Sequence, residues 1–420
     1  MNLSFSSALS VAVFSSFFFL GSCVSLKSPV SEKKSSNEIQ SSGYLVEQAT
    51  SIALSEGHRI KVRKKFDAEN WHWKNQKALG APPQSFISPV LVSDDLILLS
   101  HMGGGIGLFK KSTTSFLWHR NEKIGVSATP TFDRKFVFYM GMDAHLNKVR
   151  LDNGKLVWRR KLSAESHGGI SRANGFLYVN TADDAIWALD ERSGQVVWSY
   201  KRPSPESNVY WSMRGQAVPL LSDNSRFLYI GFSDSYFVAL NARNGDVLWE
   251  RNFRRAGRFL DADSTPVVSR NGRYLYLSVV DDALYVIEAR NGRTVWTLPK
   301  SSSASPSVDD QKNELLYSRF DNWLVSSTLD TGVVQWKTDL KNMGTASTPT
   351  LLNEKLFAVT TSNFGLVIAE RKSGKILWKK RLGFGTLAQP VFDGENIYVI
   401  SSRNYLHTFK LKKIPFVAQK

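Results

Sequence analysis

Short apolar runs separated by polar turns recur along most of the chain. Two of them, 227–231 and 236–240, flank the polar turn Ser233-Asp234. Such runs are typical of β-strands, and no window of the sequence holds the 3.6-residue apolar period of an amphipathic helix. The pattern therefore predicts an all-β protein.

A longer repeat, ending in a tryptophan, groups these runs into units. Copies such as LDNGKLVWRRKL at 151–162 and LNARNGDVLWERNF at 240–253 place a glycine where a tight hairpin requires a positive φ. The weaker copy at 108–121 lacks this glycine. The repeated tryptophans are Trp118, Trp158, Trp198, Trp249, Trp296, Trp336 and Trp378. Their average spacing of about 43 residues is typical of four-stranded propeller blades.

The two ends of the repeat array complement each other. The last unit, 389–413, has three predicted strands and no tryptophan strand, whereas 57–74 resembles one isolated strand with Trp71 or Trp73 in the repeat position. Pairing of this N-terminal strand into the last blade would close the ring and remove an exposed sheet edge. We therefore expect an eight-bladed β-propeller of four-stranded antiparallel blades over 57–413.

The N-terminus has the pattern of a secretory signal. An apolar run too short to span a membrane ends at Leu20, two small residues follow, and Cys23 is the only cysteine of the chain. We expect a signal peptide at 1–22, a flexible polar tether at 23–56 and a C-terminal tail at 414–420. The sequence Leu-Gly-Ser-Cys resembles the bacterial lipobox, which implies acylation of Cys23; the alternative is a free thiol.

The basic residues are the main feature of the composition. The chain has 54 Lys and Arg against 37 Asp and Glu, a net charge of +17. Many of them, such as Arg159, Arg160 and Lys379, fall in the tryptophan strand, the expected outer edge of each blade, where they would discourage aggregation. An acidic partner or anionic lipid headgroups are the alternatives. Nucleic acid is not an expected partner of an exported chain.

Patterns that indicate catalysis or metal binding are sparse. The seven histidines lack the paired spacing of a zinc site. The glycine run at 103–107 joins two strands and does not open a phosphate-binding helix, so it is interpreted as a hairpin turn. Asp183-Asp184 and Asp281-Asp282 occupy equivalent turns in different blades. Such repetition is expected of residues that stabilise a turn and not of a pair of catalytic carboxylates. We expect no catalytic residues, no metal and no cofactor.

Two blade-to-blade connections are longer than the others. Their surplus residues, 203–215 and 254–263, follow successive tryptophan strands, so they should emerge side by side on one face of the ring. Long loops on a rigid scaffold are where binding residues usually lie.

The long connections contain residue types suited to a protein interface. Trp211, Met213 and Arg214 belong to types enriched at interfaces, and Asp261 and Asp263 would supply polar contacts beside them. We expect these five residues to bind a partner. The alternative is that the apolar pair packs between blades while the aspartates cap backbone amides.

The repeat over 57–413 is similar to that of the quinoprotein-like propellers, and within this class the chain resembles the BamB family of outer-membrane β-barrel assembly lipoproteins. WSMRG at 211–215 matches the family's Leu-Ser-Leu-Arg-Gly loop, and DADSTP at 261–266 matches its Asp-x-Asp-Thr-Thr-Pro segment. Trp211 and Met213 replace the two leucines, which keeps the apolar character and changes the shape.

The resemblance implies a non-catalytic scaffold that binds the periplasmic part of a BamA-like subunit and assists the insertion of outer-membrane proteins. It implies a monomer within a hetero-complex that is lipid-anchored to the outer membrane and faces the periplasm. Val24 and Ser25, the two residues after the cysteine, fit sorting to the outer membrane. One alternative is a periplasmic propeller lipoprotein that binds cell-wall glycan or another envelope protein. A more remote one is a quinone-cofactor dehydrogenase, although those enzymes are typically longer and many carry adjacent cysteines.

Overall fold

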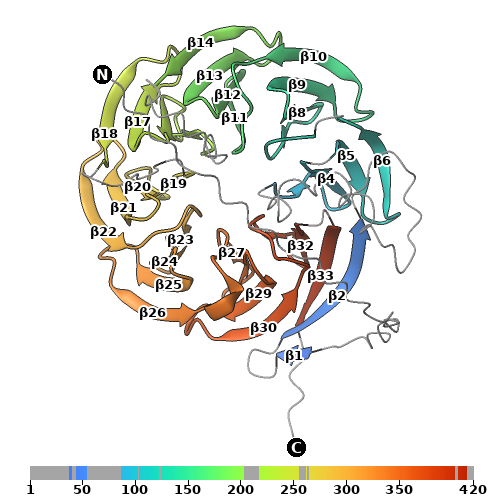
Figure 1. Cartoon of the computed structure of the whole chain (residues 1–420), viewed down its shortest axis with the longest axis vertical. Coiled ribbons are helices and arrows are strands. Elements are labelled where there is room, and N and C mark those ends of the chain that lie inside the picture. The colour runs from blue at the N-terminus through green and yellow to red at the C-terminus, as the bar shows by residue number, and fades with distance from the viewer. Residues whose placement is uncertain are drawn as a thin grey trace, which may run out of the picture. The chain divides into compact units, whose positions relative to one another are not determined.

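Eight antiparallel sheets are arranged around a central axis in the computed structural model of the protein (Figure 1). The expected all-β, eight-bladed propeller is therefore confirmed. The structure describes residues 37–39, 44–53, 87–102, 104–122, 125–202, 217–254, 262, 264–402 and 405–413, with only the backbone for 37–39, 44–53 and 412–413. Within these residues, no helix is both long enough and apolar enough to be a membrane span.

Blades 1 to 4 follow one another along the chain, each with its strands in sequential order. Blade 1 contains β3 (Val90–Leu91), β4 (Leu96–Ser100), β5 (Ile106–Lys110) and β6 (Ser115–Arg120), and blade 2 contains β7 (Thr131–Phe132), β8 (Phe136–Met140), β9 (His145–Arg150) and β10 (Leu156–Lys161). Blade 3 contains β11 (Ile170–Ala173), β12 (Phe176–Thr181), β13 (Ala185–Asp190) and β14 (Val196–Lys201), and blade 4 contains β15 (Leu220–Leu221), β16 (Phe227–Gly231), β17 (Tyr236–Asn241) and β18 (Val247–Asn252).

Blades 5 to 7 repeat this order, and blade 8 differs. Blade 5 contains β19 (Val267–Val268), β20 (Tyr274–Ser278), β21 (Ala283–Glu288) and β22 (Thr294–Pro299), and blade 6 contains β23 (Ser307–Asp309), β24 (Glu314–Ser318), β25 (Trp323–Thr328) and β26 (Val334–Asp339). A short 3-10 helix, η1 (Lys341–Met343), precedes blade 7, which contains β27 (Thr350–Leu351), β28 (Leu356–Thr360), β29 (Gly365–Glu370) and β30 (Ile376–Arg381). Blade 8 combines β31 (Val391–Phe392), β32 (Asn396–Ile400) and β33 (Tyr405–Lys413) with β1 (Asn37–Ile39) and β2 (Tyr44–Ala53).

The strand that completes blade 8 comes from earlier in the chain than expected. β2 pairs antiparallel with β33 along its whole length, and β1 pairs with the other side of β2. The prediction that 57–74 supplies this strand is wrong, because β2 takes the place beside β33; residues 57–74 lie outside the described residues. The ring therefore includes part of the segment 23–56 that was expected to be an unstructured tether.

A one-residue bulge interrupts every outer strand at the residue before its tryptophan. In β10 the pairing with β9 skips Val157, and β6, β14, β18, β22, β26 and β30 show the same shift. β2 repeats it at Ala49, so that Thr50 takes the register position that a tryptophan has elsewhere. Because a bulge twists the strand and breaks the regular row of free N–H and C=O groups, it makes the blade edge a poor template for aggregation.

The tryptophans join neighbouring blades. A Cβ atom on Gly245 would lie 2.7 Å from Cε3 of Trp198, and the indole N–H of Trp198 donates a hydrogen bond to the carbonyl of Ala242 at 3.2 Å. The turn glycine is thus required by its φ of +81° and by the close approach of the indole. The same contact joins Trp118 to Gly154, Trp158 to Gly194, Trp249 to Gly292, Trp296 to Gly332 and Trp336 to Gly374.

Some of the outer-strand arginines reinforce these joints. Nε of Arg160 donates a hydrogen bond to the carbonyl of Gly194 at 2.8 Å, and Nη1 of Arg120 donates to the carbonyl of Gly154 at 3.2 Å. Each of these arginines lies two residues after its tryptophan. Side chains that were expected only to shield a sheet edge therefore also bind the next blade.

The hydrophobic core is divided into clusters that lie between neighbouring blades, one for each of the eight joints. At the joint between blades 8 and 1, Tyr398 and Ile400 of β32 pack against Ile97 and Phe109. Full burial of one such side chain stabilises a fold by roughly 2 kcal/mol. The joints therefore supply most of the apolar burial, and they hold the ring rigid around its axis.

Candidate functional site

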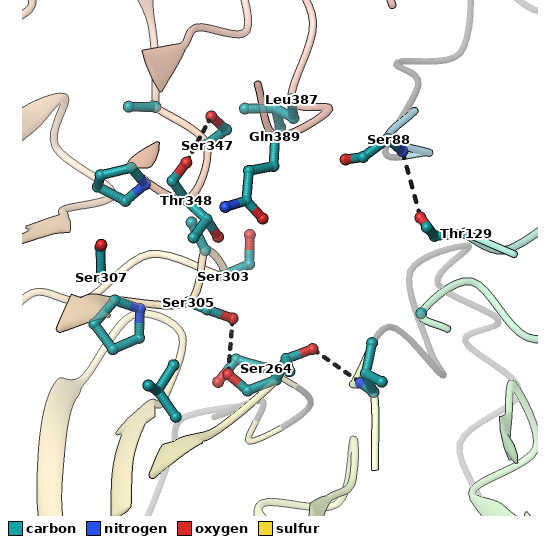
Figure 2. A pocket seen from close by; sticks show the side chains of 18 of the residues that line it. Ser88, Thr129, Ser264, Ser303, Ser305, Ser307, Ser347, Thr348, Leu387 and Gln389 are labelled. Atoms are coloured by element: carbon teal, nitrogen blue, oxygen red, sulfur yellow. Dashed lines mark hydrogen bonds between the residues drawn. The ribbon is translucent and has the colours of Figure 1, made fainter. Parts of the chain in front are cut away.

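A funnel opens on the ring axis where the blade-to-blade connections meet the innermost strands (Figure 2). Its volume is about 540 Å³. Every blade contributes to its wall, through Ser88, Thr129, Gly168, Val218, Thr265, Ser305, Ser347 and Gln389 in ring order. Because each blade has an even number of alternating strands, all these connections lie on one face of the ring, which we call the funnel face. The opposite face, formed by the hairpins that follow the first and third strands, is the turn face.

Hydrogen bonds between adjacent blades fix the wall of the funnel. The backbone N–H of Ser88 donates to Oγ1 of Thr129 at 3.3 Å, and Oγ of Ser305 donates to the carbonyl of Thr265 at 2.7 Å (Figure 2). Deeper in the ring, Oγ of Ser278 donates to the carbonyl of Ala304 at 2.9 Å. The hydroxyl groups therefore lock the blades to one another as well as presenting polar atoms to the cavity.

His167 is the titratable side chain among the residues that line the funnel. Burial lowers the pKa of its imidazole below the ordinary value, and Glu165, whose Oε1 lies 3.6 Å from Nε2, offsets only part of this effect. The imidazole is therefore neutral at neutral pH. The described wall offers hydroxyl, amide and backbone groups, which suit neutral hydrogen-bonding segments better than charged small molecules.

The carboxylates singled out in the sequence have structural roles. Asp184 accepts a hydrogen bond from the backbone N–H of Ser233 in the next blade at 3.1 Å, and Asp183 forms an ion pair with Lys201 at 2.8 Å. Asp282 accepts a hydrogen bond from the hydroxyl of Tyr285. In the described part of the chain, no three His, Cys, Asp or Glu side chains are grouped as a metal site would require.

The five residues expected to bind a partner, and Cys23, lie outside the described residues. These five are Trp211, Met213, Arg214, Asp261 and Asp263. The residues that follow the two long connections are described, and they lie at the funnel. The backbone N–H of Val218 donates to Oγ1 of Thr265 at 2.9 Å (Figure 2). The described residues that follow the two connections therefore lie side by side on the funnel face.

The start of the first long connection is held by a cluster that the sequence did not reveal. Arg202, the last described residue before this connection, forms ion pairs with Asp234 at 2.7 Å and with Glu250 at 3.0 Å, both in blade 4. Its guanidinium lies 3.7 Å from the ring centre of Tyr236. Burial opposes the charged form, but the hydrogen bonds that Arg202 donates to Asp234 and Tyr200 outweigh it and raise the pKa of Arg202. The ion-pair partners belong to the next blade, so no local spacing predicted them.

The ring of eight antiparallel blades, seven of them four-stranded, with a repeated tryptophan joint, defines a quinoprotein-like β-propeller. The solved structure of BamB from Moraxella catarrhalis has the same fold, with a TM-score of 0.70 and 20% identity over 87% of this chain and 99% of that one. A family model described as outer membrane protein assembly factor BamB matches residues 70–317 and 321–413. This chain belongs to that family.

The curated relatives are similar over shorter stretches. The outer membrane protein assembly factor BamB of Legionella pneumophila is 25% identical over 172 residues, which are 38% of this chain and 41% of the relative. That of Bordetella pertussis is 24% identical over 147 residues. This chain thus spans about two fifths of the length of the curated relatives it matches.

Quinone-dependent dehydrogenases share the fold. A 1-butanol dehydrogenase of Thauera butanivorans is 31% identical over 117 residues, but these are only 16% of that enzyme, and a quinohemoprotein alcohol dehydrogenase of Pseudomonas putida has a TM-score of 0.67 at 11% identity. An anionic quinone cofactor requires cationic partners. The described wall of the funnel contains neither lysine nor arginine, so it does not fit such a group.

Proposed function

We propose that this protein is a non-catalytic scaffold of the machinery that assembles β-barrel proteins in the outer membrane. It binds the periplasmic part of a BamA-like subunit through Trp211, Met213, Arg214, Asp261 and Asp263, and the acyl group on Cys23 anchors it to the outer membrane. Family membership supports the assembly role. The observation that supports the binding site is the hydrogen bond between Val218 and Thr265, which joins the described residues that follow the two long connections.

The binding site is tested by charge reversal in both connections at once. Arg214→Glu with Asp263→Lys should abolish co-purification with a BamA-like subunit from detergent-solubilised membranes. A matched control, Arg243→Glu with Asp246→Lys, reverses the same charges on the turn face of blade 4, at the hairpin before β18. The control should co-purify as the unmodified protein does. Retention of the subunit by the first variant would refute the assignment of these residues.

The anchor is tested separately. Cys23→Ser removes the only thiol of the chain, so it should abolish palmitate labelling and release the protein from the membrane fraction. Continued labelling of this variant would disprove acylation at Cys23. Mass spectrometry of the affinity-isolated complex would identify the further subunits.

The alternative of glycan binding gains no support from the funnel. Aromatic side chains commonly stack against sugar rings, and the described residues of its wall include no Phe, Tyr or Trp.

A further inference from the structure

The positive charge of the protein is concentrated in one half of the ring. Blades 7, 8, 1 and 2, here called the closing half, comprise 341–413 and 87–162 and contain 24 Lys and Arg against 10 Asp and Glu. Blades 3 to 6, the loop half, comprise 163–340 and contain 19 Lys and Arg against 21 Asp and Glu. The two halves therefore carry net charges of +14 and −2, and the long connections belong to the half without the surplus.

Within the closing half, four exposed lysines lie on the turn face of blades 2 and 7. Lys135 and Lys155 lie in the hairpins of blade 2, and Lys372 and Lys375 lie in a hairpin of blade 7. All four are exposed, and none of them forms an ion pair with another described residue. A cluster of unneutralised cations on one surface attracts an anionic surface over a Debye length of about 8 Å at physiological ionic strength.

On the same face of the loop half, acidic residues neutralise part of the charge. Arg293 pairs with Glu288 at 2.7 Å, and Arg172 pairs with Glu191 at 3.0 Å. Exposed arginines without a described ion pair, such as Arg226 and Arg243, also lie on this face, so the asymmetry between the halves is one of net charge and not of the number of free cations.

Apolar side chains accompany the cations at the rim. Leu156 and Val157, at the start of β10, are 42% and 47% exposed, directly after Lys155. Leu117 in β6 is 53% exposed at the equivalent place in blade 1, and equivalent residues of the loop half, such as Val197, are exposed as well, so the lysines are what distinguishes the closing half. Lysines beside exposed aliphatic side chains are the combination that binds the interface of an anionic bilayer, because the ammonium groups meet phosphates while the aliphatic groups enter the acyl boundary.

The N-terminal segment reaches the ring in the middle of this surface. Tyr44, the first residue of β2, pairs with Lys413, the last residue of β33, so β2 begins at the turn face of blade 8. Only 13 residues separate Cys23 from Asn37, where β1 begins. Thirteen residues span at most about 45 Å even when fully extended. An acyl group on Cys23 would therefore keep the closing half near the bilayer.

We propose that the turn face of the closing half docks on the anionic phospholipid headgroups of the bilayer in which the protein is anchored. This proposal builds on the lipid anchor of the proposed function. The docked orientation turns the funnel face, with the ends of the two long connections, away from the bilayer, where a periplasmic partner can reach it. The acyl group limits the distance from the membrane, and the charged face selects the orientation.

The test uses the full chain with Cys23→Ser, so that binding does not depend on the acyl group. It should sediment with vesicles of phosphatidylcholine and phosphatidylglycerol, and binding to pure phosphatidylcholine should be negligible. Reversal of Lys135, Lys155, Lys372 and Lys375 to Glu should weaken binding by on the order of a hundredfold or more. Absence of binding by the unreversed chain would overturn the proposal and leave the partner site untouched.

A matched control separates position from net charge. Arg226, Arg243, Arg270 and Arg290 are exposed on the turn face of the loop half, and their reversal to Glu changes the charge by the same amount. This control should keep its affinity within about threefold, since the loop half has no surplus of positive charge to attract the anionic surface. An equal loss in both variants would overturn the proposal, and unchanged melting temperatures would verify that both fold.

Two variants of the Cys23→Ser chain, each with one added cysteine, report the orientation. Val157 and Val247 are 47% and 45% exposed at the start of the outer strands of blades 2 and 4. An environment-sensitive fluorophore at Val157→Cys should shift to the blue on vesicle binding, and one at Val247→Cys should not. Equal shifts at both sites would contradict the proposed orientation.

Discussion

Six joints of the ring are built alike, and the joint between blades 8 and 1 is built differently. In the six, an indole covers a turn glycine, as Trp198 covers Gly245. At the closing joint, Thr50 takes the register position of the tryptophan, and the facing turn of blade 1 contains Thr114 with a φ of +50° instead of a glycine. Both members of the contact are missing together. The chain thus omits both residues of this contact where its two ends meet.

The closing joint relies on other interactions. β2 pairs with β33, and Nζ of Lys111 in blade 1 forms an ion pair with Asp393 of blade 8 at 2.9 Å. The closing joint therefore lacks the tryptophan–glycine contact, and it is held by an apolar cluster, which every joint has, and by this ion pair. The two kinds of joint should respond differently to mutation and to pH.

Removal of the closing strand should have the largest effect. Deletion of 37–53 leaves β33 with an open edge and removes the backbone hydrogen bonds of β2. At a net value near 1 kcal/mol per hydrogen bond, the free energy of unfolding should fall by on the order of 5 kcal/mol, and the protein should aggregate through the open edge. Thermal denaturation and light scattering measure both effects. A deletion variant that melts within a few degrees of the unmodified protein would show that β2 contributes little to closure.

A methyl group at an interior joint should have the next largest effect. Gly245→Ala places a Cβ atom against the indole of Trp198 in a backbone of positive φ, and should lower the free energy of unfolding by about 3 kcal/mol. Gly175 has a φ of +80°, and a Cβ atom added there would have no neighbouring atom within 4 Å, so Gly175→Ala should cost only about 1 kcal/mol. Chemical denaturation measures the difference. Equal costs would mean that the indole contact is not what constrains the glycine.

Acid should weaken the closing joint. Burial disfavours the charge of Asp393, but hydrogen bonds from Lys111, from the backbone of Asn396 and from Tyr398 outweigh it and hold the pKa of this carboxyl well below its usual range. A depressed folded-state pKa contributes stability that is complete above the unfolded pKa near 4 and is lost as the pH falls further.

Asp393→Asn should therefore cost about 2 kcal/mol at pH 7 and less below pH 4. Urea denaturation at pH 7 and at pH 3 tests this, with Asp152→Asn, in an exposed ion pair with Arg150, as the control that should change little. A cost for Asp393→Asn that does not vary with pH would contradict the electrostatic account.

Installing the missing contact should have the smallest effect. Thr114→Gly relieves a β-branched residue in a left-handed conformation, and Thr50→Trp supplies the indole, so the double variant should gain about 1 kcal/mol. The single variant Thr50→Trp, facing Thr114, should gain nothing. A double variant that is less stable than either single one would show that the closing joint cannot accept the interior geometry.

Much of the ring could be predicted from the sequence, because each blade is a local unit. The hairpin glycines and the alternating runs indicate the number and order of the blades. The closing strand could not be identified in the same way, because Trp71 and Trp73 fit the repeat and β2 contains no tryptophan. The informative signal was the copy at 108–121, whose missing glycine implies that the strand facing it has no tryptophan.

The candidate site was predicted in part. The lengths of the connections located the two loops, and the structure places the described residues that follow them side by side. The funnel was not predicted, because its wall takes one or a few small polar residues from each blade. Single serines and threonines before a strand have no distinctive spacing, and they form a surface only when the ring brings them together.

The sequence by itself determined the repeat: the strands, the turn glycines, the tryptophans and the surplus of positive charge. These features follow from interactions among neighbours along the chain, which leave a periodic trace. Only the tertiary structure decided which N-terminal segment pairs with β33, where the funnel lies and on which half of the ring the charge gathers. Pairing between distant strands depends on backbone hydrogen bonds that nearly any residue can form, so it leaves little trace in the identity of the residues.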